Sequence, residues 1–152
     1  LLSKSPFDLS GGQKRRAAIA GIIAMKPQVL ILDEPTAGLD PVGRDTIFSG
    51  INEYRNSTNA AVIIVSHSME DMAKIADKLL VLNKGKVEMF DTVENVFSNA
   101  QRLIDIGLDI PDVTKIAIEL NIKGFNISKS TFTVESLKQQ ILNCTKGGVC
   151  VC

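Results

Sequence analysis

The sequence predicts an α/β domain built on a parallel sheet, followed by a smaller, mainly helical part. Two short runs, Val29 to Asp33 and Ala61 to Val65, are almost wholly apolar and show no alternation. Such runs are typical of strands buried on both faces of a parallel sheet. A helical pattern separates them, and the segment after Asp91 contains helical patterns alone. Strands and helices in alternation predict a doubly wound sheet.

The first helix is predicted from Ser10 to Met25. Ser10 is a residue of the N-cap type, a mostly helix-forming stretch follows it, and Pro27 ends the helix. A second helix begins at Pro41, which is favoured in the first turn and follows an aspartate that can cap it. Its apolar residues recur at helical spacing until the polar residues 56–59 break the pattern.

The next elements are a short helix, Met69 to Ala76, and a third strand, Leu79 to Leu82. The sequence Asn83-Lys84-Gly85 predicts a turn into a further strand, Lys86 to Phe90. Only three or four sheet strands are then present, fewer than the roughly five or six of an average sheet. The α/β part therefore resembles half of a larger domain.

The last third of the chain is predicted to be a helical appendage. Its helices are Thr92 to Asn99, Asp112 to Asn121 and Thr133 to Leu142. We divide the chain accordingly into the α/β part at residues 1–91, the appendage at residues 92–142 and a tail at residues 143–152.

Composition excludes several classes of protein. The chain has 152 residues, and its 17 Lys and Arg balance 17 Asp and Glu. This neutrality argues against a nucleic-acid partner, because proteins that bind nucleic acids usually carry an excess of basic residues. The longest small or apolar run, Ala17 to Met25, is far shorter than the roughly 20 residues that cross a bilayer. The chain opens on Leu1 without a secretory leader, and we expect a truncated reading frame.

All three cysteines, Cys144, Cys150 and Cys152, lie in the tail. Their spacing fits neither a disulfide framework nor a zinc site, so we expect reduced thiols and a cytosolic context.

The residues Ser10, Gly11, Gly12 and Gln13 place a hydroxyl and two glycines at a helix start. Unpaired N–H groups and the helix dipole favour anions there, so a phosphate site is one interpretation. An ordinary helix cap is the other.

Two carboxylates, Asp33 and Glu34, directly follow the first strand. In parallel sheets ligands bind at this edge. In phosphoryl transfer the first carboxylate can hold Mg²⁺ through water, and the second can act as a general base. A solvated turn is the alternative.

The only histidine, His67, follows the second strand, so it is expected at the same edge as Glu34. It could contact a terminal phosphate or serve only as a structural hydrogen-bonding residue. The loop before the second helix ends in Asp40, whose simplest role is a helix cap. The cationic cluster Lys14 to Arg16 is expected to be solvated.

Together these motifs resemble those of the ATP-binding cassette (ABC) ATPases. Leu9 to Gln13 is similar to their signature motif, Val29 to Glu34 to Walker B with its catalytic glutamate, Ala37 to Asp40 to the D-loop, and His67 to the switch histidine. The resemblance covers about residues 5–90. Finer detail resembles the ATPase subunits of energy-coupling factor transporters, which power uptake of vitamins, cobalt or nickel; it lies in residues 33–44, 66–71 and 97–113.

The resemblance implies a partial P-loop NTPase fold and an ATPase that uses ATP with Mg²⁺. Asp33 would hold Mg²⁺ through water, Glu34 would activate the attacking water, and His67 would sense the γ-phosphate. Ser10, Gly11, Gly12 and Gln13 would face the nucleotide of a partner subunit, and Asp40 would communicate across the dimer.

The implied partners are a second ABC ATPase subunit, in a homodimer or heterodimer, a transmembrane coupling subunit and a substrate-binding membrane subunit. The implied location is the cytoplasmic face of the cell membrane, as a peripheral protein. The helical appendage would contribute to pairing of the two ATPases.

The chain holds no G-x-x-x-x-G-K-[ST] motif, and in the family this Walker A motif precedes the signature. We therefore expect the chain alone neither to bind ATP tightly nor to hydrolyse it, and we expect exposed strand edges to hinder its folding. Two alternatives stay open. One is an ABC ATPase of translation or DNA repair, and the other is a non-catalytic module that donates only its signature motif to a partner ATPase.

Overall fold

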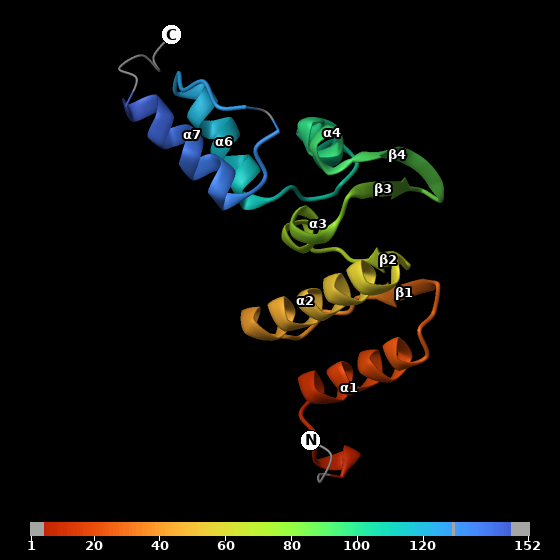
Figure 1. The fold of residues 1–152 in the computed structure, drawn as a ribbon. Coiled ribbons are helices and arrows are strands. Elements are labelled where there is room, and N and C mark those ends of the chain that lie inside the picture. The colour runs from red at the N-terminus through yellow and green to blue at the C-terminus, as the bar shows by residue number, and fades with distance from the viewer. Residues whose placement is uncertain (1–4, 129, 147–152) are drawn as a thin grey trace. The chain divides into compact units, whose positions relative to one another are not determined.

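The computed structural model describes residues 5–128 and 130–146 (Figure 1). The chain divides into two compact units, residues 1–67 and residues 68–152. Each unit is described by itself. The domain boundary that the sequence places after Asp91 stays a prediction.

The first unit follows the predicted order of helices and strands. Its elements are a 3-10 helix η1 (Pro6–Asp8), α1 (Gly11–Ala24), β1 (Val29–Asp33), α2 (Pro41–Thr58) and β2 (Ala61–Val65). Of these only η1 was not predicted.

Both long helices of this unit begin at the predicted caps. In α1 the Ser10 hydroxyl accepts from the Gln13 amide, and the Gln13 side chain accepts from the Ser10 amide, which forms a reciprocal capping box. In α2 a carboxylate oxygen of Asp40 accepts from the Gly43 amide at 2.9 Å. The α2 helix ends where Asn59 adopts a left-handed conformation, with φ of 54°.

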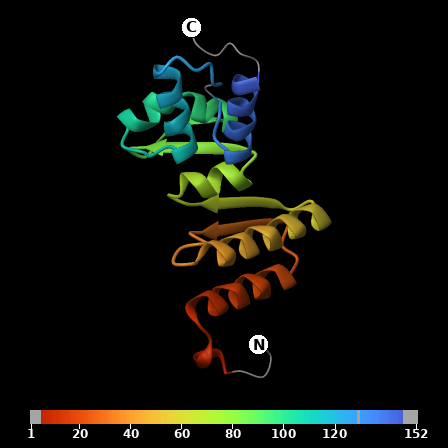
Figure 2. The ribbon, with the colours of Figure 1, turned by 90° about the vertical axis from the view of Figure 1, so that its left-hand side faces the viewer.

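The strands β1 and β2 pair in parallel, with Ile31 opposite Ile63. On β1, Leu30 and Leu32 are buried, and α2 runs along the two strands (Figures 1 and 2). The α2 helix is tied to the start of β1, because the Tyr54 hydroxyl donates to the Pro27 carbonyl at 2.6 Å.

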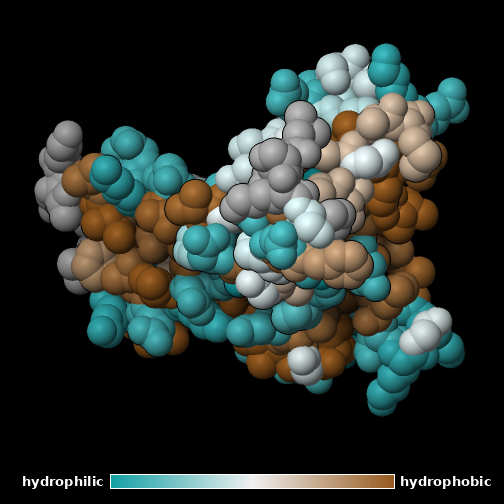
Figure 3. All heavy atoms as spheres, turned by 90° about the horizontal axis from the view of Figure 1, so that it is seen from below, coloured by the Kyte–Doolittle hydropathy of each residue, from teal (hydrophilic) through white to brown (hydrophobic). Residues whose placement is uncertain are grey.

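The expectation of strands buried on both faces is wrong for the described residues. Val29, Ile31, Ile63 and Val65 are 51–64% exposed, because in these strands alternate side chains point to opposite faces and only one face is covered. Such side chains contribute to the hydrophobic surface of the molecule, part of which is visible in Figure 3.

The second unit combines a β-hairpin with short helices. Its elements are α3 (Met69–Ile75), β3 (Lys78–Asn83), β4 (Lys86–Thr92), α4 (Val93–Ser98), α5 (Ala100–Asp105), α6 (Asp112–Ile122) and α7 (Val134–Lys146). The predicted hairpin is confirmed: β3 and β4 pair antiparallel, and Lys84 and Gly85 both have positive φ, as a tight hairpin turn favours.

The alternation of strands and helices predicts that β3 extends the sheet of β1 and β2. This prediction is wrong. The strand β3 pairs with β4 in a separate two-stranded sheet, because the turn at residues 84–85 offers it an adjacent antiparallel partner. The α5 helix was also not predicted; it begins after Asn99, which leaves helical geometry with ψ of 37°.

The main core of the second unit forms around Phe97. Phe97, Val96, Leu103 and Ile110 are each 1% exposed. A second cluster joins α6 and α7 through Ala117 and Leu137, with Ile127 between them in the chain. Two separate apolar clusters therefore hold the hairpin and the helices of this unit.

The C-terminal tail corrects one expectation. Residues 143–146 continue α7, and Cys144 is disulfide-bonded, which contradicts the expected reduced thiol. Cys150 and Cys152 lie outside the described residues. None of the helices in the described part of the chain is long and apolar enough to cross a bilayer.

Candidate active site

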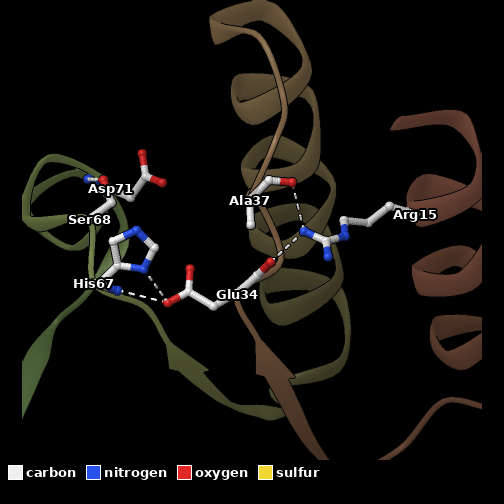
Figure 4. A network of polar contacts seen from close by, with 6 residues as sticks. All are labelled: Arg15, Glu34, Ala37, His67, Ser68 and Asp71. Carbon is white, nitrogen blue, oxygen red and sulfur yellow. Dashed lines mark hydrogen bonds and ion pairs between the residues drawn. The ribbon is translucent and has the colours of Figure 1, made fainter. Parts of the chain in front are cut away.

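Glu34 and His67 meet at the carboxyl ends of β1 and β2. One carboxylate oxygen of Glu34 lies 2.7 Å from His67 Nδ1 and accepts from the His67 amide at 3.0 Å (Figure 4). The two residues are 33 positions apart. They meet because parallel strands end at the same edge of a sheet, as the sequence predicted.

The backbone of Glu34 is held in an unusual conformation. Its φ is 46°, in the left-handed region that residues other than glycine seldom adopt. The Glu34 amide donates to the Val65 carbonyl at 2.8 Å. The Glu34 carbonyl accepts from the Ala37 amide at 3.2 Å and from Arg15 Nη1 at 2.6 Å. Strained backbone of this kind is often found at functional sites.

The electrostatics of the site favour an ionised Glu34. Partial removal from water raises the pKa of the Glu34 carboxyl, but the hydrogen bonds from His67 outweigh this and hold the pKa below its ordinary value. The Glu34 side chain is 31% exposed and that of His67 is 86% exposed. An ionised carboxylate that solvent can reach is able to accept a proton from water.

Asp33 is the last residue of β1 and is exposed. Among the described residues, no three His, Cys, Asp or Glu side chains gather in a way that could hold a metal ion. Magnesium usually keeps several waters and binds one or two carboxylates together with phosphates of a substrate. Asp33 fits that mode of binding and does not fit an all-protein metal cage.

The predicted phosphate site, Ser10 to Gln13, occupies the N-terminus of α1. The first intrahelical bond runs from the Lys14 amide to the Ser10 carbonyl at 2.9 Å. The amides of Gly11 and Gly12 lie before this bond, where a helix offers no backbone acceptor. A Cβ at Gly12 would lie 2.9 Å from Leu39 Cδ2. The glycine therefore packs closely against the loop that leads to Asp40, and a larger residue would require the Leu39 side chain to shift.

The loop between β1 and α2 is held by two arginines. Arg15 Nη1 donates to the Ala37 carbonyl at 3.0 Å, and Arg44 Nε donates to the Leu39 carbonyl at 3.2 Å. Asp40 at the end of the loop serves as the cap of α2. The solvated state expected for the cationic cluster is therefore wrong for Arg15, which is partly buried and hydrogen-bonded.

Comparisons with known proteins show which proteins the chain resembles. A family profile described as "ABC transporter" matches residues 1–37. The chain is 58% identical over 149 residues to the energy-coupling factor transporter ATP-binding protein EcfA2 of Clostridioides difficile (strain 630), an alignment that covers 97% of the chain and 52% of that protein. The chain is similar to ATP-binding proteins of ABC transporters.

Two further members of the family are similar to this chain. EcfA2 of Clostridium perfringens (strain 13 / Type A) is 54% identical over 91% of the chain and 49% of that protein. Among solved structures, cbiO1 of Clostridium perfringens, part of the ABC transporter complex cbiONQ, is 37% identical with a TM-score of 0.58, covering 68% of this chain and 41% of that one. The chain spans about half the length of the curated relatives that it matches.

The structure assembles the predicted residues into two groups. Glu34 and His67 form one group at the strand ends, beside Asp33, and Ser10 to Gln13 form the other at the start of α1. Sequence reasoning missed Arg15, which hydrogen-bonds the backbone between these groups. The only signal for it was a cation in the first turns of a helix, where the helix dipole disfavours it.

We expect His67→Ala to raise the pKa of the Glu34 carboxyl. The variant keeps the backbone donor but removes the ring, whose hydrogen bond and charge favour the ionised carboxylate. The titration is followed by NMR of the side-chain carboxyl carbons in protein labelled at glutamate. Glu88, whose pKa is lowered mainly by its hydrogen bond with Arg102, is the internal control and should not move. An unchanged Glu34 titration would contradict the role assigned to His67.

Proposed function

We propose that the full-length protein is the ATP-binding and ATP-hydrolysing subunit of an energy-coupling factor importer, which powers uptake of a vitamin or a transition-metal ion. The observation that carries the proposal is the Glu34–His67 pair at the carboxyl ends of two parallel strands, at 2.7 Å. The names of the relatives, one of which is 58% identical to the chain, support the transporter class.

In this proposal the Glu34 carboxylate accepts a proton from the water that attacks the γ-phosphate of ATP. His67 orients Glu34 and contacts the γ-phosphate. Asp33 holds the water shell of Mg²⁺, which supplies charge neutralisation to the phosphates when it is bound. The exposed ring of His67 and the partly exposed carboxylate of Glu34 leave room for a phosphate beside them.

The residues at the start of α1 serve a second nucleotide. Ser10, Gly11, Gly12 and Gln13 face the ATP bound by a partner ATPase subunit, where helix N–H groups favour its negative charge. Asp40 and its loop transmit closure of the dimer. The remaining partners are a transmembrane coupling subunit and a substrate-binding membrane subunit, which place the protein at the cytoplasmic face of the membrane. No role for nucleic acid is proposed.

The test uses a chimera in which this chain replaces the matching half of EcfA2 from Clostridioides difficile. The chimera is assembled with the partner subunits of that transporter, and ATP hydrolysis is measured beside the native complex and beside the 152-residue chain alone. We expect the chimera to hydrolyse ATP within tenfold of the native complex and the chain alone to be inactive. An inactive chimera in a correctly assembled complex would overturn the proposed function. Robust ATP hydrolysis by the chain alone would overturn the proposal that two ATPase subunits build each nucleotide site together.

A further inference from the structure

We propose that Arg15 is a positioning residue that fixes the Glu34 carboxylate by holding the backbone turn that carries it. The inference rests on the proposed function. Arg15 lies in α1, 19 residues from Glu34, and its Nη1 donates to two carbonyls of the same turn: Glu34 at 2.6 Å and Ala37 at 3.0 Å (Figure 4).

Glu34 needs such support because of its backbone. Its φ of 46° is disfavoured for a residue with a side chain, so it persists only where the surroundings hold it. The Glu34 amide is fixed by β2 through the Val65 carbonyl at 2.8 Å. On the carbonyl side the bonds come from Ala37 within the turn and from Arg15, which alone of these three partners anchors the turn to α1.

The bonds made by Arg15 are strong for their kind. A guanidinium donor is charged, and charged donors form shorter and stronger hydrogen bonds than neutral ones. One nitrogen reaches both carbonyls, so it closes the turn from residue 34 to residue 37 in addition to anchoring it. Arg15 is partly buried, which reduces competition from water.

The position of Arg15 also connects the two groups of the candidate site. The same helix begins with the residues Ser10 to Gln13, and Arg15 follows them by two positions. A displacement of α1 would therefore pull on the Glu34 carbonyl. Because the carboxylate must reach His67 and the attacking water together, a small shift of this backbone lowers the rate of the chemical step more than it weakens ATP binding.

The kinetic test compares three variants in the chimera. Arg15→Met removes the donors and keeps the length of the side chain, Arg15→Lys keeps the charge but loses the planar fork, and Lys14→Met removes the neighbouring exposed cation as a matched control. For Arg15→Met we expect kcat to fall about tenfold or more, with KM for ATP within about twofold of the unsubstituted chimera. The kcat of Arg15→Lys should lie between those of Arg15→Met and the unsubstituted chimera. The kcat of Lys14→Met should equal that of the unsubstituted chimera.

A second readout does not depend on activity. Hydrogen exchange of the Ala37 amide, which donates to the Glu34 carbonyl, is measured in the chimera and in Arg15→Met, and loosening of the turn should make this exchange faster. The Asn59 amide, which donates to the Arg55 carbonyl at the end of α2, serves as the internal control. An inactive unsubstituted chimera would count against the proposed function, yet faster exchange at Ala37 would still support the role of Arg15.

Two results would overturn the inference. One is a kcat for Arg15→Met no lower than that of Lys14→Met, and the other is an unchanged exchange rate of the Ala37 amide in Arg15→Met. If Arg15→Met fails to fold, Arg15→Lys decides the question, because it keeps the cation and changes only the geometry of donation. A kcat for Arg15→Lys equal to that of the unsubstituted chimera would then refute the positioning role.

Discussion

Glu34→Gln should lower kcat of the chimera about 100-fold or more and leave ATP binding intact, since a positioned general base contributes about 10² to 10⁴ in rate. Glutamine has nearly the shape of glutamate, and its oxygen can still accept from the His67 amide. Its amide cannot take a proton from water. The variant therefore removes the chemistry of the base and preserves the turn that carries it.

The measurement combines steady-state hydrolysis with equilibrium binding of ATP to the assembled complex. Glu53→Gln is the matched control, because Glu53 is an exposed glutamate on α2 of the same unit. We expect Glu53→Gln to hydrolyse ATP at the rate of the unsubstituted chimera. A kcat for Glu34→Gln within about threefold of that rate would show that Glu34 is not the base, because it falls well short of the contribution of a general base.

The parts of this site that sequence could predict depend on local rules or on the geometry of parallel sheets. Ser10 and Asp40 cap helices through bonds to residues three positions away, and such patterns can be read along the chain. Glu34 and His67 are 33 positions apart, but each follows a predicted strand. The rule that parallel strands end at one edge brings them together.

Arg15 follows no such rule. Its bond to Glu34 joins a helix to a loop 19 positions away, and nothing in the periodicity of α1 indicates which carbonyl it reaches. The positive φ of Glu34 is equally hidden, because glutamate is not a residue that marks this conformation. A contact between two elements that follows no sequence pattern is visible only in the structure.

Burial was the least predictable property of the strands. The apolar residues of β1 and β2 predict a strand location correctly, but apolar sequence does not reveal what covers each face. In the described structure Ile31 is 64% exposed while its neighbour Leu30 is 2% exposed. The difference arises because only the face that carries Leu30 is buried, and that depends on which segments pack against the sheet.

Phe97→Ala is expected to have the largest effect on stability, in the second unit of the chain. Phe97 is 1% exposed, packs with Val96, Leu103 and Ile110, and its ring lies 5.8 Å from that of Phe132. Replacement of a buried phenylalanine by alanine lowers the free energy of unfolding by about 3–5 kcal/mol, because apolar contacts are lost and a cavity is left. The free energy of the opening that exposes the α4 and α5 amides to hydrogen exchange should fall by about this amount.

Native-state hydrogen exchange of the α4 and α5 amides measures this free energy in the second unit without assuming that both units unfold together. Phe90→Ala is the control, since Phe90 is in the same unit but 65% exposed, and a surface substitution changes stability by about 0.5 kcal/mol. Equal effects of the two substitutions would mean that the cluster around Phe97 is not the core that stabilises these helices. A large loss for Phe97→Ala alone would establish that burial, and not aromatic character, decides the contribution of each ring.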